Sequence, residues 1–218
     1  HRDLHSFPTR RSSDLFVRRV YLDLIGTLPT AQEVRKFLGD KRLDKRDKLV
    51  DSLLARDEFA DYWTLKWCDV LRVKAEYPVN LWPNAVQAYH RWIYESVRDN
   101  KPYDEFARQL LTASGSNFRV PQVNFYRAIQ GRKPADIAEA AALTLMGTRL
   151  KTWPQERRQE LETFFSRVAY KSTAEWKEEI VYPDPAQTDS LEAVFPDGTK
   201  VKIGPDDDPR KVFADWLI

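Results

Sequence analysis

One stretch near the middle of the chain constrains the fold more than any other, the segment between residues 80 and 100, NLWPNAVQAYHRWIYESVRDN. Its apolar side chains recur at the three- and four-residue spacing of one helical face: Val86, Tyr89, His90, Ile93 and Val97. Pro83 suits the first turn of this helix, because the N–H that proline lacks would have had no partner there. The large aromatic residues on and beside this face predict that the helix carries much of the core packing.

The rest of the first 170 residues shows the same periodicity in shorter segments. The capping pair Thr30 and Glu33 indicates where one helix begins, and Gly26 and Gly147 are suited to end two others. The predicted helices cover residues 16–26, 31–39, 45–55, 59–73, 104–112 and 134–146, and a last long helix begins near Pro154 and runs through Val168.

After residue 170 the pattern changes to short strands. Three apolar runs are separated by turn residues, at 180–182, 191–195 and 200–203. The sequence FPDGTKVKI alternates and carries an Asp-Gly turn, which is a strong local signal for a hairpin. The predicted fold is therefore mainly α, a multi-helix orthogonal bundle with a small C-terminal β hairpin or three-stranded sheet.

These patterns divide the chain into four expected segments. Residues 16–170 form a helical domain, 171–205 a small β appendage, and 206–218 the start of a helix leading into a further domain downstream. Residues 1–15 are expected to be disordered, because HSFPTRRSSDL matches a reading frame of a common sequencing adapter and shows no period. The alternative for this segment is a native arm that binds nucleic acid through its arginines.

Composition and charge argue against several functional classes. The chain holds 35 basic and 33 acidic side chains, so there is no electrostatic case for nucleic acid or an anionic membrane as a partner. No apolar run approaches the length of about 18 residues that a membrane span needs. The single cysteine, Cys68, cannot form an internal disulfide.

The motifs that mark common catalytic sites are missing from the sequence. There is no glycine-rich dinucleotide or phosphate loop, no nucleophile elbow and no zinc-protease motif. Beyond residue 15, Cys68 and His90 are the only cysteine and histidine, too few for a metal centre of ordinary type. Glu178 and Glu179 are adjacent on a predicted strand and should face opposite sides, so they cannot flank one substrate atom. We therefore expect no catalytic, cofactor-binding or metal-binding residues.

One polar and aromatic cluster is a candidate ligand site. Its aromatic rings could stack on a sugar while the amides beside them form hydrogen bonds. The possible ligand-binding residues are Trp82, Asn84, His90, Asn117 and Tyr126, with Asn80, Phe118 and Asn124 in the same cluster. The alternatives are that the asparagines serve helix caps and turns, and that His90, on the apolar face, is a hydrogen-bonded core histidine.

Five segments in fixed order resemble the planctomycete cytochrome-associated domain of unknown function. They are FVRRVYLDLIGTLPTAQEVRKFL, DKRDKLVDSLLARDEFADYWTLKWCDVLR, NLWPNAVQAYHRWI, NKPYDEFARQLLTASGSNF and VNFYRAI. The resemblance extends over residues 16–218 and implies a large exported protein of the periplasm or cell envelope. It also implies, as partners on the same polypeptide, a cytochrome-like domain upstream and a second domain of unknown function downstream.

The chain departs from this family at the place where many members carry a haem-attachment motif. In those members Cys-X-X-Cys-His, with a following His-Pro-Phe, comes just after the alanine-rich helix and would supply two thioethers and an axial imidazole. Here the corresponding stretch, residues 146–154, reads MGTRLKTWP and has neither cysteine nor histidine. Covalent haem attachment at this point is therefore chemically impossible, and no cofactor is expected.

The function expected from these observations is that of a non-catalytic structural or interaction module of a larger exported protein. Missing catalytic motifs, balanced charge and abundant aromatic residues all favour this interpretation. Two alternatives remain open: a carbohydrate-binding or carbohydrate-processing component that uses the aromatic and amide cluster, and an electron-transfer-associated domain that has lost its haem site.

Overall fold

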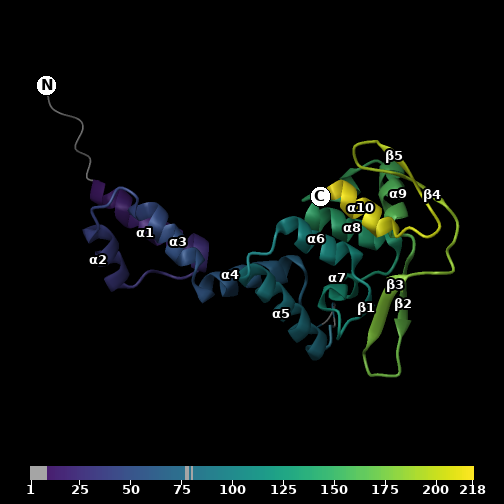
Figure 1. Cartoon of the computed structure of the whole chain (residues 1–218), viewed down its shortest axis with the longest axis horizontal. Coiled ribbons are helices and arrows are strands. Elements are labelled where there is room, and N and C mark those ends of the chain that lie inside the picture. The colour runs from purple at the N-terminus through teal and green to yellow at the C-terminus, as the bar shows by residue number, and fades with distance from the viewer. Residues whose placement is uncertain (1–8, 77–78, 80) are drawn as a thin grey trace. The chain divides into compact units, whose positions relative to one another are not determined.

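The computed structural model describes residues 9–76, 79 and 81–218. Helices make up 56% of it, and two small antiparallel sheets follow in the C-terminal half, which confirms the predicted mainly α class. The chain forms two compact units, His1–Lys66 and Trp67–Ile218, which we call the first and second unit (Figure 1). The expected boundaries at residues 15, 170 and 205 do not coincide with this division.

The first unit is a small helical bundle. Its helices are α1 (Thr9–Ile25), α2 (Ala31–Gly39), α3 (Lys45–Leu54) and the beginning of α4 (Asp57–Val70). Helix α1 contacts both α2 and α3. Their inward side chains form one apolar core: Val17, Tyr21, Ile25, Phe37 and Leu53.

Local signals in the sequence explain where these helices begin and end. Gly26 has a φ of +69°, the left-handed conformation that lets α1 end without a Cβ clash. At the start of α2 the predicted capping box is confirmed, since Glu33 N donates to Thr30 Oγ1 and Thr30 N donates to Glu33 Oε2. The disorder expected for residues 1–15 is wrong over 9–15, where α1 has already begun. No glycine or proline interrupts the chain between Thr9 and Ile25, so the helix continues; residues 1–8 lie outside the described part.

The second unit contains the remaining helices. They are α5 (Pro83–Arg98), α6 (Tyr103–Thr112), α7 (Asn124–Arg127), α8 (Pro134–Leu145), α9 (Gln155–Glu162) and α10 (Pro209–Leu217), with 3-10 turns η1 (Pro121–Val123), η2 (Leu150–Thr152) and η3 (Thr163–Phe165). The alanine-rich helix α8 is largely buried and contacts α9, η2 and η3. Its small side chains allow close approach of these neighbours, which places α8 in the middle of the core.

The strands form two sheets. The first has the order β1-β3-β2, with β1 (Gly115–Ser116) and β2 (Val168–Ser172) antiparallel to β3 (Glu179–Pro183). The second is the predicted hairpin of β4 (Leu191–Val194) and β5 (Lys200–Ile203), in which Ala193 lies opposite Val201. Gly198, in the turn between them, has a φ of +93°, as the Asp-Gly signal suggested.

The long helix expected through Val168 is wrong. Helix α9 ends at Glu162, a 3-10 turn follows, and Val168 already begins β2. The turn buries Phe164 and Phe165 completely, and β2 then pairs with β3. That pairing depends on residues about ten positions further along, which a local helical period cannot indicate.

The sheets share the core of the helices, so the β segment is not a separate satellite. Val181, Ala193 and Ile203 belong to the same buried cluster as the inner residues of α5, α6 and α8. Phe195, which follows β4, stacks on Phe164 with a centroid distance of 5.0 Å. Strands and helices of this unit therefore depend on one another for burial.

Helix α5 is amphipathic as predicted, but one residue of the predicted stripe is misplaced. Its buried residues are Ala85, Tyr89, Trp92, Ile93 and Ser96. His90 is exposed, so its expected place on the core side is wrong. One residue rotates the helix by about 100°, and the bulky Trp92 takes the buried position instead. Across the described residues, no helix has both the length and the apolar character needed to cross a membrane.

Candidate functional site

Two exposed indole rings lie together on the surface of the second unit. Trp82 directly precedes α5 and Trp176 lies in the turn between β2 and β3. Their ring centroids are 6.1 Å apart with the planes inclined at 38°, and the residues are 43% and 71% exposed. Tryptophan is highly buried on average, so two adjacent exposed indoles mark a candidate contact surface.

Asn117 holds the turn that carries Trp176. Its Oδ1 accepts a hydrogen bond from Glu179 N at 2.9 Å, and its Nδ2 donates to Lys177 O at 3.3 Å. Within the turn, Thr173 Oγ1 donates to Glu178 Oε2 at 2.7 Å. Lys177 has a φ of +61°, a conformation that costs a non-glycine residue about 1 kcal/mol or more. The side-chain clamp from Asn117 therefore fixes a strained turn and with it the position of the indole.

The other predicted ligand residues are divided between surface and core. Asn84 is exposed on the first turn of α5, and His90 is exposed further along the same helix. Tyr126 is buried; its hydroxyl donates to Leu111 O and its ring lies under Arg210, with the guanidinium carbon 5.5 Å from the centroid. A buried ring cannot stack on a sugar, so Tyr126 is a core residue.

The remaining members of the predicted cluster have structural roles or lie outside the described residues. Asn124 is fully buried and donates to the carbonyls of Asn117 and Pro121 at 2.8 and 3.0 Å. Asn80 is not among the described residues. Sequence reasoning missed Trp176, although the run TAEWKEE already shows a large apolar residue among polar neighbours with no periodic partner.

An ion network lies at the first residue of β3. Glu179 accepts from Arg127 at 2.5 Å and from Arg132 at 2.7 Å, and its side chain is only 7% exposed. Arg132 also lies over the Tyr170 ring at 4.9 Å. Burial lowers the pKa of Arg127. These contacts attach α7 and the segment after it to β3, which is a structural role.

The two neighbouring glutamates have different partners, but the prediction that both lie on one strand is wrong, because β3 begins at Glu179 and Glu178 directly precedes it. Glu178 accepts hydrogen bonds from Ser116 and Thr173, whereas Glu179 binds Arg127 and Arg132. The pair therefore does not present two carboxylates to one position.

The residues that could support redox or thiol chemistry do not form a site in the structure. Cys68 is half-buried, and this burial raises the pKa of its thiol to about 11, so it is a neutral thiol at pH 7. In the part of the chain that the structure describes, no three His, Cys, Asp or Glu side chains converge as a metal centre would require. The stretch after α8, where related sequences are expected to carry haem, forms η2, and Trp153 Nε1 donates to Thr148 Oγ1 at 3.3 Å.

Comparison with known proteins gives one match. The sequence model of a family described as PSCyt2, protein of unknown function (DUF1549), matches residues 5–182. The matched region contains both exposed indoles and the strands that position them. No curated protein and no solved structure matches the chain.

Proposed function

The chain belongs to the PSCyt2 family of proteins of unknown function (DUF1549), and we propose that it is a non-catalytic interaction module that binds a saccharide on the indole pair Trp82 and Trp176. The observation that carries the proposal is the exposure of these two adjacent rings. A soluble surface gains nothing from presenting two large apolar rings side by side unless a partner covers them.

Aromatic rings suit sugars because a sugar ring has a face of C–H groups and a rim of hydroxyls. The C–H face packs on an indole, and the hydroxyls need polar partners around it. Asn84 supplies an exposed amide two residues from Trp82, and the Lys177 ammonium lies 6.0 Å from the centroid of the Trp176 ring. The two planes are inclined at 38°, so they fit successive sugar rings that are rotated against one another.

The charge of the chain favours a neutral ligand on this surface. With 35 basic and 33 acidic side chains the protein exerts little long-range attraction on a polyanion. The proposal also includes export of the module as part of a larger polypeptide, because the module would encounter extracellular saccharides outside the cell. The resemblance to exported proteins supports this part.

Titration calorimetry with a panel of neutral oligosaccharides tests the proposal. The panel consists of β-linked glucans, xylans and mannans of four to six units, added to the full chain. Trp176→Ala and Trp82→Ala should each weaken binding by about two- to ten-fold, the loss expected for one stacked aromatic contact. Tyr103→Ala is the matched control, because it removes another exposed aromatic ring, 54% exposed, from the same unit.

Two results would contradict the proposal. One is the absence of heat with every saccharide of the panel. The other is an equal loss of affinity in Tyr103→Ala and Trp176→Ala, which would mean that the rings do not contact the sugar. Circular dichroism of each variant distinguishes loss of binding from loss of fold.

A further inference from the structure

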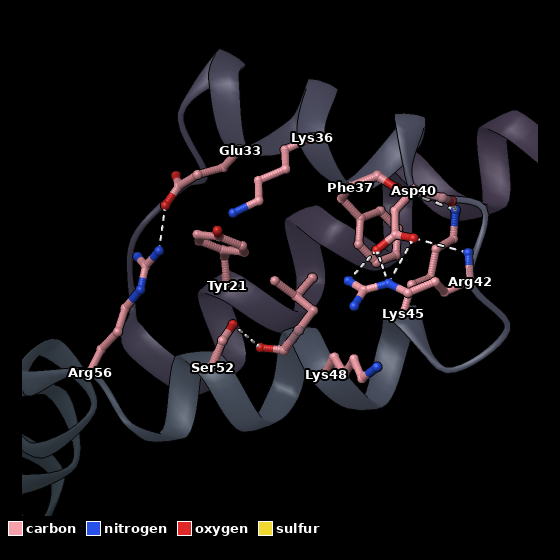
Figure 2. A pocket seen from close by; sticks show the side chains of 11 residues that line it. Tyr21, Glu33, Lys36, Phe37, Asp40, Arg42, Lys45, Lys48, Ser52 and Arg56 are labelled. Carbon is pink, nitrogen blue, oxygen red and sulfur yellow. Dashed lines mark hydrogen bonds and ion pairs between the residues drawn. The ribbon is translucent and has the colours of Figure 1, made fainter.

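The first unit contains a cationic pocket that is separate from the indole pair. It opens between α1, α2 and α3, and Figure 2 shows the side chains that line it. Its volume is about 230 Å³, below the range of roughly 300–1,000 Å³ typical of drug-sized ligands. Its lining has five cationic side chains and two carboxylates. The cations are Lys36, Arg42, Lys45, Lys48 and Arg56, and the carboxylates are Glu33 and Asp40.

Both carboxylates are already bound by arginines at the two ends of the pocket. Glu33 Oε1 accepts from Arg56 at 2.5 Å. Asp40 accepts from Arg42 through both of its oxygens, with Nε to Oδ1 at 3.0 Å and Nη2 to Oδ2 at 2.6 Å. Neither acid is therefore free to neutralise a third cation.

Two of the lysines also have partners. Lys45 Nζ donates to the carbonyls of Phe37 and Asp40, at 3.3 and 2.9 Å, and so ends α2. Lys48 pairs with Asp44 at 2.8 Å. Within the residues that the structure describes, the Lys36 ammonium has no hydrogen bond or ion pair, and Figure 2 shows this side chain extending toward the Tyr21 ring. The lining thus carries three net positive charges, and one ammonium is unpaired.

The floor of the pocket is apolar. Tyr21 is only 2% exposed, and Phe37 and Leu49 line the wall beside it. A ligand of this pocket must therefore combine a small apolar or ring-shaped body with a negatively charged head. We propose that the pocket binds a small organic oxyanion, a carboxylate, sulfate ester or phosphate ester of about monosaccharide size, with the Lys36 ammonium on the anionic group and the partly exposed Leu49 side chain against its body.

This inference is independent of the proposed function, because every residue involved belongs to the first unit and the indole pair belongs to the second. A negative result for the anion pocket therefore does not contradict saccharide binding on the indole pair, and a negative result for the indole pair does not contradict the anion pocket. Inorganic phosphate and sulfate carry the same charged head without an organic body, so the experiment has one arm for inorganic ions and one for acidic sugars.

Calorimetry and thermal shift at constant ionic strength test the proposal. The probes are inorganic phosphate, inorganic sulfate, glucuronate and glucose 6-phosphate, each up to about 10 mM, with neutral glucose as the uncharged comparison. We expect glucuronate or glucose 6-phosphate to bind more tightly than either inorganic ion, because only they fill the apolar floor. Lys36→Gln should weaken that binding about ten-fold, as expected for one charge-assisted hydrogen bond.

Lys41→Gln is the matched control. It removes the same charge from an exposed position in the loop after α2, outside the lining of this pocket. Equal losses in Lys36→Gln and Lys41→Gln would overturn the proposal, because they would show nonspecific charge attraction. So would binding of neutral glucose as tight as that of glucuronate, or the absence of any anion effect up to the highest concentration. Lys36 is exposed and unpaired, so its replacement does not threaten the fold.

Discussion

Arg210 donates to both carboxylate oxygens of Asp208, from Nε to Oδ1 at 3.0 Å and from Nη2 to Oδ2 at 2.8 Å. The same guanidinium donates to Ala113 O and to Ser114 Oγ, each at 2.8 Å, although these residues lie almost a hundred positions earlier. Arg210 is only 1% exposed. A buried cation therefore joins the beginning of α10 to the end of α6.

Replacement of Arg210 by methionine should destabilise the chain strongly. The change leaves the Asp208 carboxylate, 12% exposed, without its partner, and breaking a buried pair in this way costs about 3–5 kcal/mol. Urea denaturation followed by circular dichroism measures the loss. Arg108→Met is the matched control, because Arg108 pairs with Asp215 between the same two helices at the surface. It should cost less than about 1 kcal/mol, and equal effects would contradict the assignment of Arg210 as a buried anchor.

The lowered pKa of Glu33 predicts how the free energy of unfolding changes at acid pH. A hydrogen bond from Arg56, with smaller contributions from Thr30 and Tyr21, lowers this pKa from 4.5 to about 2. A carboxyl with a lowered pKa in the folded state stabilises the fold above its unfolded pKa, and this contribution is lost as the pH falls through about 2. Glu33→Gln should therefore cost about 1 kcal/mol at pH 7, and the difference from the parent should shrink between pH 4.5 and 2. Denaturation midpoints of the parent and the variant across this pH range provide the measurement, with Asp51→Asn on the exposed side of α3 as the control. A difference in stability between parent and Glu33→Gln that stays constant with pH would show that ionisation of Glu33 does not stabilise the fold.

Alanine substitutions at three glycines distinguish the effect of a steric clash from that of backbone strain. Gly26→Ala introduces both, because Gly26 has a φ of +69° and a Cβ there would lie 2.3 Å from a ring carbon of Tyr62. Gly147→Ala introduces only backbone strain, since its φ is +64° and no other atom lies within 4 Å of the added Cβ. Gly39→Ala meets neither and should stabilise α2 by up to about 1 kcal/mol. The melting temperature should therefore fall most for Gly26→Ala and by the equivalent of about 1 kcal/mol for Gly147→Ala. It should rise slightly for Gly39→Ala. Any other order of the three melting temperatures contradicts the local geometry.

Cys68 should react slowly with alkylating reagents. Burial raises the pKa of its thiol to about 11, and only the thiolate is nucleophilic. The rate of reaction with iodoacetamide should therefore keep rising with pH beyond 9, without the plateau of an ordinary thiol near its pKa of about 8.5. The urea-unfolded chain is the control and should titrate normally. A folded protein that reacts as fast as the unfolded one at pH 7.5 would show that the thiol is accessible.

Local signals were sufficient for most helices and for one hairpin. The Thr30 and Glu33 capping box, the left-handed glycine at 26 and the Asp-Gly turn all depend on residues within four positions of one another. For this reason their outcome could be derived from the sequence with no knowledge of the fold.

The candidate sites were only partly predictable. Trp82 is a candidate from the sequence alone, but its partner Trp176 lies more than ninety residues away, and no local pattern indicates that the two rings meet. Tyr126 was predicted as a ligand residue and is buried under Arg210, a contact over more than eighty residues. His90 was assigned to the wrong side of its helix, because the neighbouring Trp92 decides which side packs inward.

The sequence by itself determined the helical class of this protein, the capped start of α2, the glycine at the end of α1 and the scarcity of residues for metal or haem chemistry, because each depends on composition or on neighbours along the chain. Only the tertiary structure decided that Val168 leaves the helix for a strand, which indoles meet at the surface, and which lysine of the pocket lining remains unpaired. These outcomes depend on contacts between distant segments, whose free energy exceeds local preference and is not encoded in any single stretch.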